Sequence, residues 1–139
     1  MSVPVSTILA LGGAAMLVSC STAPPVQEGR SPQAAHDLAS ALAGRTARPA
    51  VDCIPNYRTS QMQVIDDWTI LFRDGGTVYV QNPRGGCRGI SRGSTILVSR
   101  LYGSTQLCSG DIQQLIDSST RMTQGSCVFG PFIPYPRAG

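Results

Sequence analysis

The pattern of apolar and polar residues divides the chain into three parts. Residues 5–19 form an uncharged, mostly apolar run. Residues 20–51 contain several Ser, Thr, Pro and Gly residues, with no aromatic residue and no strand-like run. From Asp52 onwards, short apolar stretches alternate with Gly, Pro and Asp. We therefore expect a processing segment over 1–19, a tether over 20–51 and one small domain over 52–136.

The predicted domain consists of short strands. Residues 77–82 alternate between apolar and polar side chains, which is the period of a strand with one buried face. The preceding Asp74-Gly75-Gly76 is a hairpin turn signal. Residues 111–117 fit either a short helix or a strand, and a strand is preferred because strands flank them. The pattern predicts a mainly β fold, a small barrel or sandwich of five to six short strands, over residues 62–66, 68–73, 77–82, 95–101, 111–117 and 126–133.

The segment over 20–51 is expected to be flexible, because it lacks the apolar residues that a packed core needs. Residues 33–43 within it are rich in Ala and could form a transient helix. A helix of this length is marginal on its own. His36 is the only histidine and lies in this stretch, so we expect it to be solvated outside the domain.

The apolar run near the N-terminus ends in a recognisable tetrad. The run is shorter than the roughly 20 residues that span a membrane, and it fits an export signal. Its last residues, Leu17-Val18-Ser19-Cys20, resemble the lipobox of bacterial lipoproteins. The resemblance implies that Cys20 receives a diacylglyceryl group and becomes the first mature residue. Residues 1–4 lack the Lys or Arg that usually begins an export signal, and an unlipidated secretory signal is the alternative.

Lipidation implies a place in the cell. Two or more acyl chains hold a protein stably on a membrane, so the membrane is the expected partner through the lipid on Cys20. Ser21 follows Cys20, in place of the Asp that typically retains enterobacterial lipoproteins at the inner membrane. The resemblance therefore implies a cell-envelope protein at the outer membrane, facing the periplasm.

Four further cysteines lie in the predicted domain, at positions 53, 87, 108 and 127. An even number in a small exported domain indicates two disulfides. A zinc site usually shows closely spaced cysteine pairs, whereas the successive separations here are 34, 21 and 19 residues. No metal is therefore expected. Three pairings are possible, and we prefer Cys53–Cys127 with Cys87–Cys108, which would join the ends of the domain and crosslink its middle.

The domain also resembles a family of small exported bacterial proteins that has no assigned activity. The resemblance covers roughly Cys53 to Pro134. It implies a secreted or lipoprotein context, and it favours a strand over 111–117. The motifs that carry it are Cys53-Ile54, the strand pair around Trp68 and Tyr79, Cys87, Leu107-Cys108-Ser109-Gly110-Asp111 and Cys127-Val128-Phe129-Gly130.

Charge and motifs limit the chemistry. The net charge of +3 is too small to indicate nucleic-acid binding. The chain has no Gly-rich phosphate loop and no nucleophile elbow, so no cofactor is expected. Arg84, Arg88 and Arg92 recur every four residues on a Gly-rich stretch, and guanidinium groups bind phosphate and carboxylate. They are candidate residues for binding an anionic envelope lipid or cell-wall polymer, and a solvated loop is the alternative.

The carboxylates indicate structural roles. Asp66 and Asp67 are neighbours in or next to a strand and would point in opposite directions, which argues against an acid–base pair. We expect Asp67 to end a strand, and Asp111 to accept backbone N–H groups in a tight turn. The sequence therefore favours a non-enzymatic binding or structural module. The alternative is a small envelope enzyme that uses Asp111 with a nearby Arg. The oligomeric state is not predicted.

Overall fold

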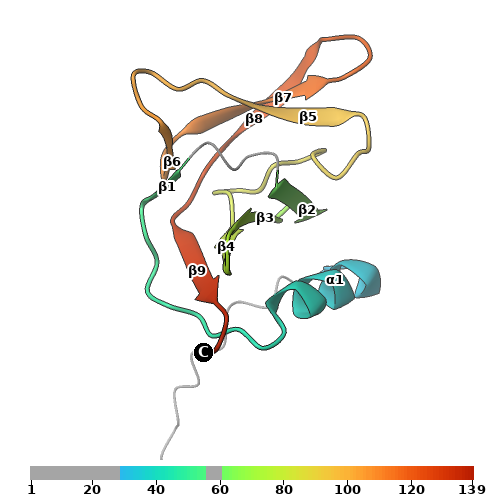
Figure 1. The fold of residues 1–139 in the computed structure, drawn as a ribbon. Helices are drawn as coiled ribbons and strands as arrows, with labels where there is room; N and C mark the ends of the chain where they lie inside the picture. Colours follow the sequence, from blue (N-terminus) through green and yellow to red (C-terminus); the bar gives the residue numbers. More distant parts are fainter. Residues whose placement is uncertain (1–28, 56–60) are drawn as a thin grey trace, which may run out of the picture.

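The computed structural model describes residues 29–55 and 61–139 (Figure 1). In this part of the chain, one helix and nine strands form a mainly β fold, which confirms the predicted class. The strands outnumber the five to six predicted, because the pattern does not predict the very short strands β1 and β6 and one predicted run is divided in two. The elements are α1 (Pro32–Leu42), β1 (Cys53–Pro55), β2 (Met62–Asp66), β3 (Thr69–Asp74), β4 (Thr77–Gln81), β5 (Thr95–Ser99), β6 (Gln106–Cys108), β7 (Ile112–Asp117), β8 (Thr123–Val128) and β9 (Phe132–Pro136).

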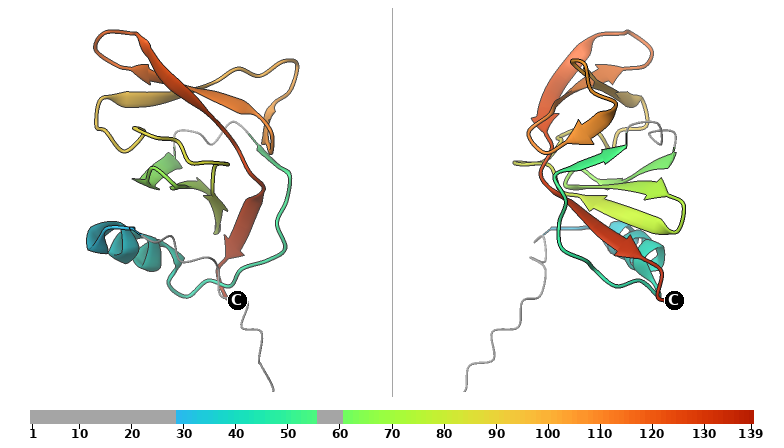
Figure 2. Two further views of the ribbon diagram at one scale, coloured as in Figure 1. Left: turned by 180° about the vertical axis from the view of Figure 1, so that it is seen from behind. Right: turned by 60° about the vertical axis from the view of Figure 1, so that its left-hand side comes forward.

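The strands form three antiparallel sheets that stack with the helix in layers (Figures 1 and 2). The four-stranded sheet, in the order β2-β3-β4-β9, has α1 on one face and the three-stranded sheet β5-β7-β8 on the other. Strands β1 and β6 form a separate pair. The predicted hairpin joins β3 to β4 through Gly75, which has a φ of 54°. Strand β7 confirms the preferred strand over 111–117.

The four-stranded sheet buries side chains on both faces. Because side chains alternate along a strand, Phe72 of β3 lies in the core shared with the three-stranded sheet, and Leu71 lies under α1. The larger core contains the rings of Phe72, Phe129 and Phe132, in edge-to-face contact with centroids 5.7 to 5.9 Å apart. The smaller core consists of Leu71, Val78 and Val80.

The described part of the predicted tether is packed on the domain, so the expectation of flexibility is wrong for residues 29–51. The Ser31 side chain caps α1 by accepting the N–H of Ala34 at 3.2 Å. Leu38 and Leu42 then pack against the smaller core. This apolar burial stabilises an 11-residue helix that would be marginal alone.

The chain after α1 continues along the sheet. Backbone N–H groups of Thr46, Arg48 and Val51 donate to carbonyls of β9 at 2.8 to 3.4 Å. Before the helix, Arg30 forms an ion pair with Asp66 at 2.7 Å. The packed domain therefore includes residue 30, well before the predicted start at residue 52. The predicted processing segment over 1–19 and Cys20 lie outside the described residues.

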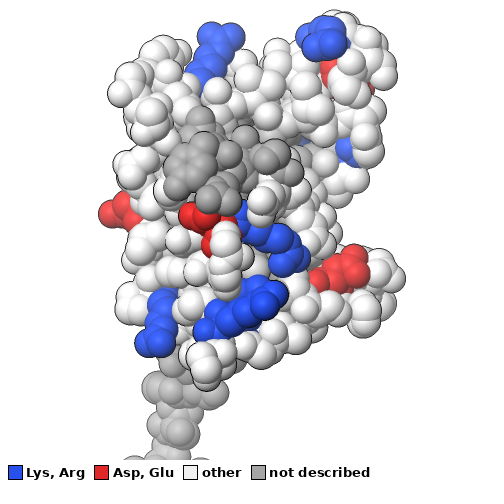
Figure 3. Space-filling model, in the orientation of Figure 1, with Lys and Arg blue, Asp and Glu red and all other residues white. Residues whose placement is uncertain are grey.

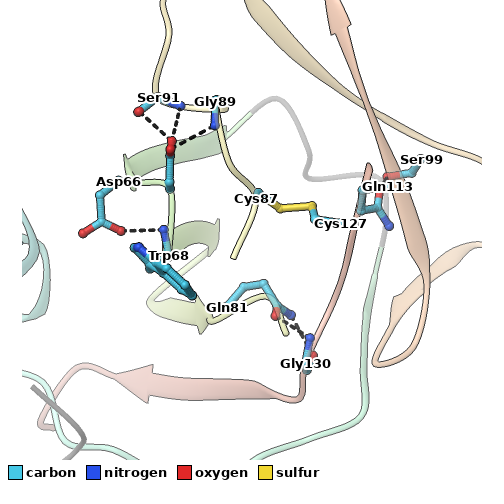
Figure 4. Close-up of a disulfide and its surroundings, with 11 residues drawn as sticks. Asp66, Trp68, Gln81, Cys87, Gly89, Ser91, Ser99, Gln113, Cys127 and Gly130 are labelled. Atoms are coloured by element: carbon cyan, nitrogen blue, oxygen red, sulfur yellow. Dashed lines mark hydrogen bonds between the residues drawn. A yellow bond between two sulfur atoms is a disulfide. The ribbon is translucent and has the colours of Figure 1, made fainter. Parts of the chain in front are cut away.

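The predicted strand over 126–133 is two strands in different sheets, because the chain changes direction at Gly130. A Cβ atom at Gly130 would lie 2.7 Å from the carbonyl oxygen of Asn82. The buried Gln81 side chain accepts the Gly130 N–H and donates to its carbonyl, both at 2.8 Å (Figure 4). This close contact fixes the point where the chain passes from β8 to β9.

The four domain cysteines form two disulfides, as predicted, but the preferred pairing is wrong. The bonds join Cys53 to Cys108 and Cys87 to Cys127, in place of Cys53–Cys127 and Cys87–Cys108. Cys53 and Cys108 are direct cross-strand partners in the β1-β6 pair. Cys127 lies on β8, beside the loop that carries Cys87 (Figure 4). Strand pairing, which the cysteine spacing does not report, sets both partnerships.

Candidate functional site

The candidate anion-binding arginines lie on the connection between β4 and β5. We call residues 84–93 the arginine loop. Backbone contacts hold its first half: the Arg84 N–H donates to Val128 at 2.8 Å, and the Cys87 N–H donates to the Asp67 carbonyl at 2.7 Å. The Cys87–Cys127 disulfide and the buried side chain of Ile90 attach it to the larger core. The loop is therefore fixed in place, although it has no regular structure.

The carboxylate of Asp67 holds the second half of the arginine loop. It accepts the Gly89 N–H at 2.9 Å, the Ser91 N–H at 3.1 Å and the Ser91 hydroxyl at 2.6 Å. Burial acts to raise the pKa of Asp67, but these hydrogen bonds and the nearby Arg92 charge outweigh it and lower the pKa. Asp67 thus clamps a loop that lies more than 20 residues further along the chain.

The loop also packs against the side chain of Trp68. Gly86 has a φ of 77°, and a Cβ atom there would lie 2.9 Å from the indole ring. Any other residue at this position would have to displace the ring or the loop. Trp68 itself is 38% exposed. Gly86 thus allows the backbone of the arginine loop to approach the β2–β3 turn closely.

The structure brings two of the three candidate arginines together. Arg84 and Arg88 line a groove of about 370 Å³ whose other wall includes Gln124 and Ser126 of β8. Arg84 is oriented by a hydrogen bond of 3.2 Å from its Nη2 atom to the Ser109 hydroxyl. Arg92 does not line the groove, and its charge lies near Asp67. All three residues are exposed.

The lowered pKa of Asp67 predicts an acid-sensitive clamp. An unfolded-state Asp has a pKa of about 3.9, so the ionised clamp stabilises the fold above that pH. The stabilisation should be lost as the pH falls from about 4 through the lower folded-state pKa. Urea unfolding at about pH 7 and about pH 3 should show a larger loss of stability in the wild type than in Asp67→Asn. The N–H groups of Thr120 and Ser119 lower the pKa of Asp117 as well. Asp117 is present in both proteins, so its contribution to the loss of stability cancels when the two losses are compared. Equal losses in the two proteins would contradict the clamp.

Asp111 and Asp66 also have structural partners. Asp111 accepts the N–H of Cys108 at 2.7 Å, which confirms the expected tight turn. Asp66 accepts the N–H of Trp68 at 2.8 Å and pairs with Arg30. Since Asp67 binds the arginine loop, Asp66 and Asp67 do not converge. The side chain of His36 is 76% exposed, as expected, but it does not lie outside the domain, because α1 is packed against the smaller core.

Within residues 29–55 and 61–139, no three His, Cys, Asp or Glu side chains are grouped as metal ligands. Over the same residues, no helix has the length and apolar character to cross a membrane.

Sequence reasoning missed the clamp and the far wall of the groove. The sequence predicts only that Asp67 ends a strand, because no local pattern connects it to residues 89 and 91. Gln124 and Ser126 lie on a strand whose first half was not predicted. Their place in the groove follows from the pairing of Arg84 with Val128, which joins the loop to β8. A long-range contact of this kind has no signal in a single sequence.

Comparisons with protein-family models, curated proteins and solved structures find no match for this chain. The resemblances to bacterial lipoproteins and to a family of small exported proteins therefore rest on the sequence motifs alone.

Proposed function

We propose that this protein is a lipid-anchored, non-enzymatic binding module of the bacterial cell envelope, at the outer membrane facing the periplasm, and that its arginine loop binds anionic lipid headgroups. The observation that carries the proposal is the Asp67 clamp. It holds the loop at 2.6 to 3.1 Å while Arg84 and Arg88 stay exposed on one groove. The two disulfides fit an oxidising compartment outside the cytoplasm.

The fixed loop supports binding in two ways. Because the backbone is already held, an incoming anion orders only side chains, and less conformational entropy is lost on binding. No Asp or Glu is among the described residues that line the groove, so the two guanidinium groups have no carboxylate beside them there. Guanidinium groups bind phosphate oxygens through paired N–H donors. An anionic headgroup matches this chemistry.

The anchor favours a lipid over a cell-wall polymer. Residues 20–28 separate the proposed lipidation site from the described domain, and a chain of that length reaches at most about 32 Å. A domain held so close to a membrane meets lipid headgroups at high local concentration. Binding to an anionic cell-wall polymer in place of lipid is the other outcome of the test below.

Replacing Arg84 and Arg88 with Gln should weaken binding to phosphatidylglycerol vesicles by about fivefold for each arginine, because a basic residue near an anionic surface contributes about 1 kcal/mol. Co-sedimentation of residues 20–139, which include every described residue, measures this. The chain carries Cys20→Ala so that no acyl chain contributes. Stability should change by less than about 0.5 kcal/mol, since both side chains are exposed.

The matched control is Arg100→Gln with Arg121→Gln, which removes the same charge from exposed positions outside the groove. It should bind like the wild type, and Arg92→Gln should have little effect on binding. Wild-type binding should fall as salt rises, because exposed charges are screened within about 10 Å at 0.1 M. Equal binding by the loop variant and its control would contradict the proposal. Selective binding of cell-wall polymer would replace the lipid as partner.

Cys20→Ala should abolish the incorporation of labelled palmitate and release the protein from the membrane fraction. The reason is that the lipobox places the acylated residue at Cys20. Labelling of cells that express each form, followed by fractionation, measures both effects. Palmitate incorporation equal to that of the wild type would exclude Cys20 as the lipidation site.

The enzyme alternative receives less support. It requires Asp111 to act as an acid or base with a nearby arginine. The Asp111 carboxylate already accepts the Cys108 N–H, and Arg84 donates to Ser109. Among the described residues, no ion pair joins Asp111 to an arginine.

A further inference from the structure

A second group of arginines lies on the other side of the four-stranded sheet, beside α1. Arg45, Arg73 and Arg137 line an open cleft of about 590 Å³. We call it the helix-side cleft. Arg45 follows α1, Arg73 lies on β3 and Arg137 follows β9. In Figure 3, basic side chains gather on the lower half of the face shown, next to the helix. The three arginines are far apart in the sequence, so the fold alone brings them together.

Two of these arginines are oriented by neutral partners. Arg45 donates through Nη1 to the carbonyl of Gly76 at 2.5 Å and to that of Tyr135 at 3.0 Å. Arg73 donates through Nη2 to Oε1 of Gln63 at 2.9 Å. These contacts fix the side chains, and neither guanidinium group forms an ion pair with a described carboxylate. Each guanidinium group also keeps further N–H donors for a ligand.

The cleft holds more positive than negative charge. Arg45 and Arg137 are direct cross-strand neighbours in an antiparallel bridge, and like charges in such positions are destabilising. Among the described residues, Asp37 is the one carboxylate that lines the cleft, and it accepts Nε2 of Gln33 at 2.7 Å. No described arginine of the cleft forms an ion pair with it. The nearby C-terminal end of α1 adds about half a negative charge, less than three guanidinium groups supply.

We propose that the helix-side cleft is a second anion site, which binds a phosphate group of a small molecule or headgroup. A phosphate oxygen cluster accepts hydrogen bonds from several directions, whereas a carboxylate offers one planar face to one or two arginines. Three guanidinium groups from three segments therefore match phosphate better. A bound phosphate would also relieve the repulsion between Arg45 and Arg137. This site shares no residue with the arginine loop and does not depend on the proposed function of that loop.

Inorganic pyrophosphate is the probe, with glycerol 3-phosphate as the headgroup analogue. Each compound is titrated separately into residues 20–139 carrying Cys20→Ala, and ¹H–¹⁵N NMR follows the arginine Nε–H signals. We expect saturable shifts at Arg45, Arg73 and Arg137. Arg137→Gln should weaken binding at least about tenfold, the loss expected for one charged hydrogen-bonding group. Arg137 is exposed, and no described residue accepts a hydrogen bond from its side chain, so this variant should fold normally.

Two controls separate this site from general charge effects. Arg100→Gln removes the same charge at an exposed position outside the cleft and should leave the affinity within about twofold, or about 0.4 kcal/mol. The Arg84→Gln, Arg88→Gln variant should bind pyrophosphate like the wild type even if it fails to bind vesicles. Tighter binding of glycerol 3-phosphate than of pyrophosphate would identify a headgroup as the source of the phosphate. Shifts that do not saturate, or unchanged affinity in Arg137→Gln, would overturn the proposal.

Discussion

Replacing Cys87 and Cys127 together with Ala should lower the free energy of unfolding by at least about 4 kcal/mol. The disulfide closes a loop with a sequence separation of 40, and the loss of loop closure in the unfolded chain accounts for about 4 kcal/mol. Both cysteines are buried in the larger core, so their removal also leaves unfilled space. Since small domains have a total stability of about 5–15 kcal/mol, much of the stability should be lost.

Guanidinium chloride unfolding, followed by the fluorescence of Trp68, measures this loss, because Trp68 is the only tryptophan. The matched control is Cys53→Ala with Cys108→Ala. Its loop has a sequence separation of 55 and a similar entropic contribution of about 4 kcal/mol. Cys53 and Cys108 are only partly buried, so the control should lose less than the Cys87 variant. A smaller loss in the Cys87 variant than in the control would contradict the placement of this disulfide in the core.

Phe129→Ala should lower the free energy of unfolding by about 3–5 kcal/mol, the range for removing a buried aromatic ring. Phe129 is fully buried and contacts the rings of both Phe72 and Phe132. It also directly follows β8, where the chain crosses to the four-stranded sheet. Loss of this ring should therefore weaken the contact between the two sheets.

The same unfolding experiment measures this effect, with Val51→Ala as the control. Val51 is 38% exposed. Its truncation should therefore lower the free energy of unfolding by less than about 1 kcal/mol, the typical effect of a single substitution. Near-neutral behaviour of Phe129→Ala would mean that the three rings do not form the core that joins the sheets.

Local patterns account for the elements that were predicted correctly. The alternation over 77–82 and the Asp74-Gly75-Gly76 turn each involve neighbouring residues, and strands β3 and β4 with their hairpin lie where these patterns place them. The number of disulfides follows from the even number of cysteines in the domain and the expected exported context. The spacing of Arg84 and Arg88 on a Gly-rich stretch marks both as candidates, and both line one groove.

Long-range contacts explain what the sequence did not reveal. The cysteine partners depend on which strands pair. Helix α1 is stable because Leu38 and Leu42 pack against a sheet whose strands come later in the sequence. The clamp joins Asp67 to a loop more than 20 residues away. One missed feature did have a local signal, because Gly130-Pro131 interrupts the run over 126–133, and Pro is disfavoured inside a strand.

Residue-by-residue footprinting shows whether the clamped arginine loop contacts anionic lipid. Residues 20–139 carrying Cys20→Ala are treated with phenylglyoxal, which modifies exposed arginines, with and without phosphatidylglycerol vesicles, and modified residues are identified by mass spectrometry. We expect the vesicles to protect Arg84 and Arg88 while Arg100 and Arg121 remain reactive. Equal modification of all four arginines with and without vesicles would contradict this contact.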